Sequence, residues 1–102
     1  MRLEFSAYAR EDLLGILTFI ARDNPKQARQ FVASLRQQCN QLTEFPMMGV
    51  AKLEYAPDIR MLAYQRYLIF FSVHADKQIV LIERVLHSAR NISEVLAKDK
   101  SK

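Results

Sequence analysis

The sequence predicts one α+β domain over residues 1–102, in which an N-terminal strand and an antiparallel helical hairpin pack on an antiparallel β-meander, followed by a short C-terminal helix. Two patterns lead to this prediction. Before Gly49, apolar residues recur at helical spacing, and after it they form nearly continuous runs of branched and aromatic residues, as strands buried on both faces do. Helices followed by strands in this order are typical of a two-layer α+β sandwich.

The first half of the chain predicts a strand and two helices. After a short strand over residues 2–5, Ser6 can cap a helix over 7–22, because its hydroxyl can accept a hydrogen bond from a free N–H group of the first turn. Pro25 is typical of the first position of a helix, so a second helix is expected over 25–44. The joint between them is so short that the helices form an antiparallel hairpin, whose apolar stripes must be buried against the strands.

The second half predicts the meander and the last helix. Strands are expected over 59–64, 67–73 and 78–86, with the first of them at the sheet edge because its alternation is only partial. A short helix is expected over 91–96, since an asparagine with a glutamate three residues later is typical of a helix start. The charged residues 97–102 are expected to fray.

Regular turns in the meander would bring basic and aromatic residues to one face. They would place Arg60 opposite Phe71 and Tyr67 opposite Arg84, and period-two alternation then adds Tyr64 to the same face. The opposite face would support the helices through Met61, Ala63, Leu68, Phe70, Ile79 and Leu81. The residues expected to be buried in the core are Leu17, Phe31, Leu35, Phe70 and Leu81.

The composition limits the class of protein. A net charge of +4 favours an acidic partner, which can be a nucleic acid, an acidic protein or an anionic surface. The single cysteine, Cys39, can form no internal disulfide, and the sequence has neither an apolar signal segment nor a run of the ~20 apolar residues that span a bilayer. We therefore expect a cytoplasmic protein that does not contact a membrane. Cys39 and the two histidines lack metal-ligand spacing, so neither a metal nor a cofactor is expected.

Polar side chains replace apolar ones where the last predicted strand ends, at Arg84, His87 and Arg90. Arginine and tyrosine suit contacts to phosphates and bases, and they suit a protein interface equally well. His87 can be a general acid or base, or a partly buried hydrogen-bonding residue. The arginines can also pair with nearby carboxylates, which are Glu54, Asp58 and Glu83.

Four stretches of the sequence are informative together: Pro46-Met47-Met48-Gly49, then Arg60, then Tyr67-Leu68-Ile69-Phe70-Phe71, and finally Arg84-Val85-Leu86-His87-Ser88-Ala89-Arg90. With these stretches and the predicted order of elements, the chain resembles the RelE/ParE superfamily of toxins from bacterial toxin–antitoxin pairs. The resemblance covers nearly the whole chain. The closing stretch is its most specific part, and it is similar to the ParE branch.

The resemblance implies a toxin that is not an enzyme and that inhibits DNA gyrase, a type II topoisomerase. The residues that the resemblance and the predicted basic face together assign to the target are Arg60, Tyr67, Arg84, His87 and Arg90.

The RelE branch provides the alternative, a ribosome-dependent endoribonuclease of messenger RNA. Such toxins carry an arginine where this chain has Leu68, and a late arginine and tyrosine near the positions of Ser88 and Glu94. These departures favour the ParE branch. If the chain is a ribonuclease, its catalytic residues would be Arg84, His87 and Arg90. A second alternative is a non-toxic basic binding domain of the same fold.

The resemblance also implies a ParD-like antitoxin whose C-terminal segment wraps the toxin. The helical hairpin and a sheet edge can accept an amphipathic helix and an added strand. Both a homodimer and a toxin–antitoxin hetero-oligomer are compatible with this partner. The expected antitoxin-binding residues are Leu13, Leu17, Ile20, Phe31 and Leu35.

Overall fold

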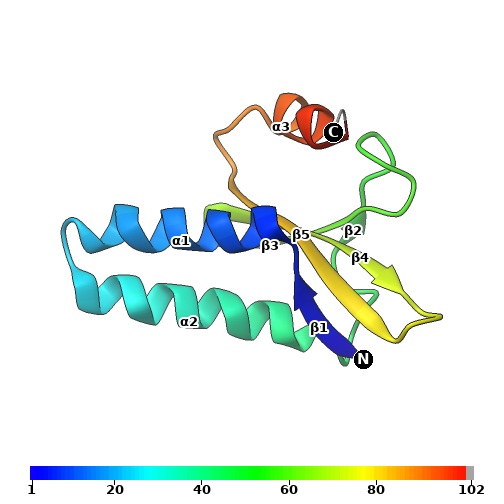
Figure 1. Cartoon of the computed structure of the whole chain (residues 1–102), viewed down its shortest axis with the longest axis horizontal. Coiled ribbons are helices and arrows are strands. Elements are labelled where there is room, and N and C mark those ends of the chain that lie inside the picture. Colours follow the sequence, from blue (N-terminus) through cyan, green and yellow to red (C-terminus); the bar gives the residue numbers. More distant parts are fainter. Residues whose placement is uncertain (101–102) are drawn as a thin grey trace.

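The computed structural model describes residues 1–100 and confirms the predicted α+β fold. Its elements, in chain order, are β1 (Arg2–Phe5), α1 (Ala7–Ala21), α2 (Pro25–Gln41), β2 (Val50–Ala51), β3 (Arg60–Tyr64), β4 (Tyr67–His74), β5 (Ile79–His87) and α3 (Ile92–Lys100). Figure 1 shows the two long helices side by side and antiparallel, with α3 apart from them. Within the described part of the chain, no helix combines the length and the apolar character needed to cross a membrane.

All strands belong to one sheet with the order β1-β5-β4-β3-β2. β1 runs parallel to β5, and the other neighbours are antiparallel. The predicted edge position of β3 is wrong, because the two-residue strand β2 pairs with it and takes that edge. The segment before β3 has no periodic pattern, so the sequence did not indicate β2.

The predicted helix starts are confirmed. The Ser6 hydroxyl accepts a hydrogen bond from the Ala9 N–H group at 3.0 Å, and it donates one to the carbonyl oxygen of Glu83 at 2.7 Å. At the second helix, Pro25 is the first residue, and the Asn24 side chain accepts from the Gln27 N–H group. Ser6 therefore both caps α1 and fixes that end of the helix to β5.

The register of the meander agrees with the prediction in one hairpin and differs in the other. Arg60 lies opposite Phe71 as predicted. Between β4 and β5, however, Tyr67 lies opposite His87 instead of Arg84. The turn accounts for part of the shift. A β-bulge accounts for the rest, because Phe70 pairs with Arg84 and Phe71 with Ile82, which leaves an extra residue between them.

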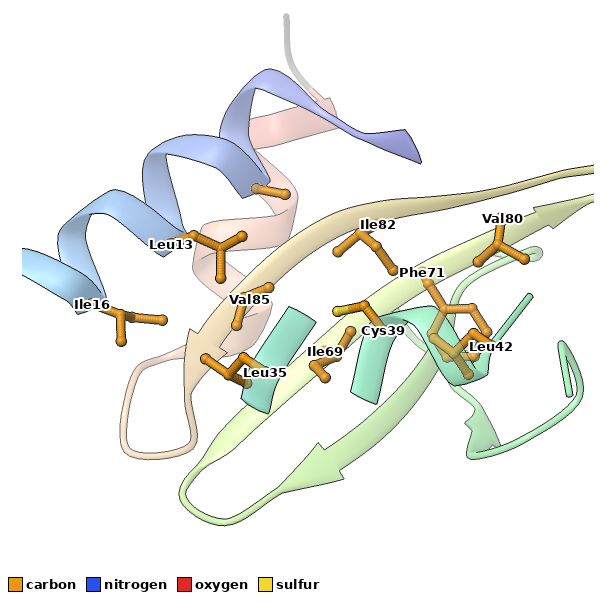
Figure 2. Close-up of a cluster of buried hydrophobic side chains, with 11 residues drawn as sticks. Leu13, Ile16, Leu35, Cys39, Leu42, Ile69, Phe71, Val80, Ile82 and Val85 are labelled. Atoms are coloured by element: carbon orange, nitrogen blue, oxygen red, sulfur yellow. The ribbon is translucent and has the colours of Figure 1, made fainter. Parts of the chain in front are cut away.

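The helices cover the face opposite to the predicted one. The main core joins α1 and α2 to the sheet face that carries Ile69, Phe71, Val80, Ile82 and Val85, whose side chains meet those of the helices in Figure 2. Phe70, predicted to lie under the helices, packs instead in a second cluster under α3. Every position of β4 up to Val73 except Ser72 is apolar or aromatic, so the alternation that distinguishes the faces is missing.

The predicted core is correct in part. Leu35 and Phe70 are fully buried, whereas Leu17, Phe31 and Leu81 are only half-buried. Phe31 lies at the margin of the main core, where its ring packs against two tyrosines of the sheet.

The C-terminal helix is longer than predicted. The Asn91 side chain accepts a hydrogen bond from the Glu94 N–H group, which confirms the helix start. The predicted fraying from residue 97 is wrong as far as Lys100, because α3 continues to that residue and Asp99 is anchored on β5. Residues 101–102 of the predicted tail lie outside the described part of the chain.

Candidate functional site

A cleft of about 480 Å³ opens between α1 and the end of β5, and we call it the α1–β5 cleft. Its lining residues are Glu11, Asp12, Gly15, Ile16 and Phe19 from α1, together with Tyr67, Val85, Leu86, His87 and Arg90. Three residues expected to bind the target thus meet in one place, namely Tyr67, His87 and Arg90. Tyr67 and His87 meet because the turn and the bulge set the register of β4 against β5, and in that register the two residues are paired.

The environment of His87 fixes which ring nitrogen carries its proton. The backbone N–H group of Ala89 donates to His87 Nδ1 at 3.0 Å. Since Nδ1 accepts this bond, the ring can donate to a ligand only through Nε2. The ring stands edge-on to Tyr67, with 5.2 Å between the ring centroids. His87 therefore offers a donor to a ligand in this state, and its acceptor nitrogen is already in use.

Tyr67 is held by rings from both layers. Besides His87, it packs against Phe31 of α2 at a centroid distance of 5.5 Å, and Phe31 also stacks on Tyr64 at 6.0 Å. Because the Tyr67 ring touches neighbours on two sides, its position in the cleft wall is set by packing in the free chain.

Arg84 does not fit the predicted role in target binding. The residue is buried, and its Nε and Nη2 donate to the two carboxylate oxygens of Asp12 at 2.8 and 2.9 Å. Its Nη1 donates to both oxygens of Asp99 at 3.0 Å. The hydrogen bonds to Asp12 raise the pKa of the Arg84 guanidinium above its ordinary value against the opposing effect of burial, and Asp99 adds to the increase. Arg84 is thus a structural cation that joins α1, β5 and α3.

Arg60 also lies outside the cleft. Its Nη2 donates to the carbonyl oxygens of Met47 and Gly49, at 2.8 and 3.3 Å. These bonds hold the loop before β2 against β3. Gly49 adopts φ +77° there, and a Cβ atom would lie 2.2 Å from the Met61 carbonyl oxygen, so the loop requires glycine. Arg60 therefore acts on the loop, and the structure does not bring it to the other predicted target residues.

Two of the residues expected to bind the antitoxin are part of the core. Leu13 of α1 and Leu35 of α2 are buried in the core between the helices and the sheet and are not available to a partner, while Leu17, Ile20 and Phe31 are half-buried. Large apolar residues that are mostly exposed, and that the helical stripe did not predict, are Leu14, Phe19, Phe45, Met47, Val50 and Leu53. The exposure of Leu14 and Phe19 could have been predicted from the sequence, because helical spacing places both residues outside the buried apolar stripe of α1.

Other reactive groups lie away from the cleft. The Cys39 thiol is fully buried, and burial raises its pKa from 9.0 to about 12, which makes it a weak nucleophile. Over the residues that the structure describes, no three His, Cys, Asp or Glu side chains cluster as the ligands of a metal ion would.

Comparison with known proteins connects this fold to a family. Residues 3–92 match the family model described as ParE toxin of type II toxin-antitoxin system, parDE. The structure is similar to a chain of the "Chromosomal ParDE TA system from P. aeruginosa", with a TM-score of 0.70, 21% identity, and coverage of 85% of this chain and 95% of that chain. It is also similar to the isolated E. coli RelE toxin, with a TM-score of 0.60, 18% identity, and coverage of 99% and 98%. No curated protein sequence matches the chain.

Because their sequence identity to this chain is low, the two solved structures show a similarity of fold only. The family match is of another kind, because it spans most of the sequence, including every element from α1 to β5. The protein therefore belongs to the ParE toxin family of type II toxin–antitoxin systems, and it has a RelE/ParE-like fold.

Proposed function

We propose that this toxin acts in the cytoplasm by binding and inhibiting DNA gyrase, that it is not an enzyme, and that a ParD-like antitoxin neutralises it. The observation that carries the proposal is the ParE family match together with the α1–β5 cleft, in which Tyr67, His87 and Arg90 are accessible to a partner. Arg60 and Arg84 leave the proposed target-binding set, because both have structural bonding partners.

The hydrogen bonds of His87 and Arg84 argue against ribonuclease chemistry. Cleavage next to a ribose needs a base for the 2′-hydroxyl and a group that stabilises the charged phosphate. The acceptor nitrogen of His87 is occupied by the Ala89 N–H group, and Arg84 is bound to two carboxylates. Of the three residues that would form a ribonuclease centre, only Arg90 remains free to meet a phosphate.

The test is a supercoiling assay with purified gyrase and the purified toxin. We expect the wild-type chain to inhibit supercoiling or to accumulate cleaved DNA. The single substitutions Arg90→Ala and Tyr67→Ala should each weaken both effects. Arg22→Ala, a position on the helical hairpin away from the cleft lining, is the matched control. Translating ribosomes are treated in parallel. Codon-specific messenger cuts that disappear in His87→Ala, with gyrase unaffected, would reject gyrase inhibition in favour of the ribonuclease.

The antitoxin proposal rests on family membership and on the charge and exposure of the helical hairpin. The similar P. aeruginosa chain comes from a ParDE system, which motivates a ParD-like partner here. The hairpin carries half-buried apolar residues, Leu17, Ile20 and Phe31, and cations such as Lys26 and Arg29 are exposed on it. An acidic amphipathic segment would suit this surface, with ion pairs at the rim.

Calorimetry with the product of the adjacent gene tests the antitoxin proposal. Tight binding is expected. In stopped-flow mixing of the two proteins, the association rate should fall as salt is added, since rim charges steer the encounter. Complete absence of binding would reject this partner. Mixing toxin and antitoxin in a sizing experiment distinguishes a hetero-oligomer from a toxin homodimer.

A further inference from the structure

The α1–β5 cleft holds a helical glycine that the fold itself does not need. Gly15 lies within α1, where glycine is less favourable than alanine because it loses more backbone freedom on folding. A Cβ atom built at Gly15 would meet nothing within 4 Å. No packing contact among the residues that the structure describes therefore requires glycine at this position. The absence of a side chain does have one effect, which is to leave the wall of the cleft open to a close approach.

The walls beside Gly15 are mainly apolar. Phe19 lies one turn further along the same face of α1 and is 66% exposed, while the buried residues Ile16, Val85 and Leu86 form the base of the cleft. A large aromatic side chain that stays exposed beside a concave apolar surface is typical of an interface, where a partner covers it.

Two opposite charges line the cleft without meeting. Glu11 lies on α1 and Arg90 follows β5, and neither forms a side-chain hydrogen bond or ion pair with residues 1–99, whose side chains the structure describes. Asp12, which also lines the cleft, is already paired with Arg84. The free charges of the cleft are therefore one carboxylate and one guanidinium, which complement a segment that carries both signs.

This charge balance selects the kind of occupant. Phosphates of a nucleic acid would be attracted by Arg90 and repelled by the nearby carboxylate of Glu11. A strongly acidic antitoxin segment is better matched by the exposed cations of the helical hairpin, which include Lys26 and Arg29. The cleft instead fits a protein segment without strong net charge whose apolar side chain enters between Gly15 and the end of β5.

We propose that the α1–β5 cleft is the pocket into which gyrase inserts one apolar anchor residue, flanked by an acidic residue facing Arg90 and a basic residue facing Glu11, with Gly15 keeping the pocket open. That the partner is gyrase rests on the proposed function. The kind of segment that the cleft binds is inferred from the cleft alone. An anchor of this kind contributes a large share of binding, because a single side chain that fills a desolvated pocket is usually a hot spot.

The test fills the pocket without disturbing the fold. Gly15→Leu places a bulky side chain in the cleft at a position with open space, and Gln30→Leu adds the same side chain to the exposed surface of α2 as a control. Both variants should melt at or above the wild-type temperature, since each leaves the core unchanged. Gly15→Leu should weaken inhibition of supercoiling by about ten-fold or more, as expected when an anchor is excluded, and Gln30→Leu should not.

Failure of this inference is distinguishable from failure of the proposed function. If the wild-type chain inhibits gyrase and Gly15→Leu inhibits it equally, the pocket is wrong and gyrase inhibition stands. If the wild-type chain stops growth but leaves gyrase active, gyrase is rejected both as target and as occupant. Gly15→Leu that loses antitoxin binding while it remains toxic would overturn the proposal in favour of the antitoxin. Binding of a labelled single-stranded oligonucleotide that Gly15→Leu abolishes would overturn it in favour of nucleic acid.

Discussion

Arg84 and Asp12 form a two-point ion pair between α1 and β5, with hydrogen bonds at 2.8 and 2.9 Å and both side chains about one-tenth exposed. β1 pairs with β5 only as far as Ile82, so β5 has no strand neighbour on that side beyond this residue. The Asp12 carboxylate takes the place of that neighbour by accepting from the Val85 N–H group at 3.0 Å. Asp12 therefore satisfies a buried cation and a backbone donor together.

The first prediction concerns this ion pair. Asp12→Ala should lower the free energy of unfolding by about 3–5 kcal/mol, because it leaves a buried guanidinium without its main partner. Asp99→Ala should cost less, since the Asp99 side chain is more exposed and the other carboxylate remains. Glu4→Ala, which removes the exposed Arg2–Glu4 pair, is the control and should cost about 1 kcal/mol or less. Urea unfolding measures all three, and equal effects of Asp12→Ala and Glu4→Ala would contradict the structural role.

The sequence predicted the elements well because their signals are local. The cap at Ser6, the proline at the start of α2 and the change of apolar spacing after Gly49 each involve a few neighbouring residues. Family resemblance indicated the cleft residues Tyr67 and His87, although the predicted register would have separated them by three positions along β5.

The errors arise where distant contacts decide the structure. A one-residue bulge at the middle of β5 moves Arg84 to the opposite face of the sheet, and nothing in the local sequence marks it. The main partner of Arg84, Asp12, lies 72 residues away on α1, and neither it nor Asp99 is among the acids that the sequence suggested. The uniformly apolar run of β4 likewise conceals which face the helices cover.

The second prediction contrasts the two glycines. Gly49→Ala should destabilise the toxin by about 1–3 kcal/mol or more, because it forces a side chain into a left-handed backbone conformation and against the Met61 carbonyl oxygen. Gly15→Ala should raise stability by about 0.5–1 kcal/mol, since a helical site with open space gains from alanine. Thermal melts of both variants measure this difference. A destabilising Gly15→Ala would mean that α1 needs its glycine for folding.

The third prediction concerns pH. Burial keeps the Cys39 thiol protonated in the folded chain up to a pKa of about 12, whereas the unfolded thiol ionises near 9.0. The contribution to stability is therefore complete below about pH 9 and is lost as the pH rises toward 12. The loss in this window should be about 1.4 kcal/mol per pH unit for this one group. Urea unfolding over the same pH range should show a smaller decline in the free energy of unfolding for Cys39→Ala than for the wild-type chain. Parallel declines in the two proteins would contradict the burial effect.

The last prediction separates binding from catalysis at the two histidines. His87 lines the α1–β5 cleft, with its ring edge-on to Tyr67 and its Nδ1 occupied by the Ala89 N–H group. His74 is the matched control. It lies at the end of β4 opposite to Tyr67, where its Nε2 is 2.9 Å from the Ser72 hydroxyl. His87→Ala should weaken inhibition of gyrase by about five-fold or more, as for an interface residue in a packed pocket, and His74→Ala should leave inhibition nearly unchanged.

The same two variants address chemistry through a different readout. A binding role requires that messenger RNA on translating ribosomes stay intact with the wild-type chain and with both variants, because no step then involves proton transfer at His87. A catalytic role would instead give cuts with the wild-type chain and with His74→Ala that His87→Ala abolishes. The occupied Nδ1 favours the first outcome, since a base that acts through this nitrogen would first have to give up its bond to Ala89. Gyrase inhibition and RNA cleavage are thus measured on the same three proteins, and the two roles of His87 predict opposite results.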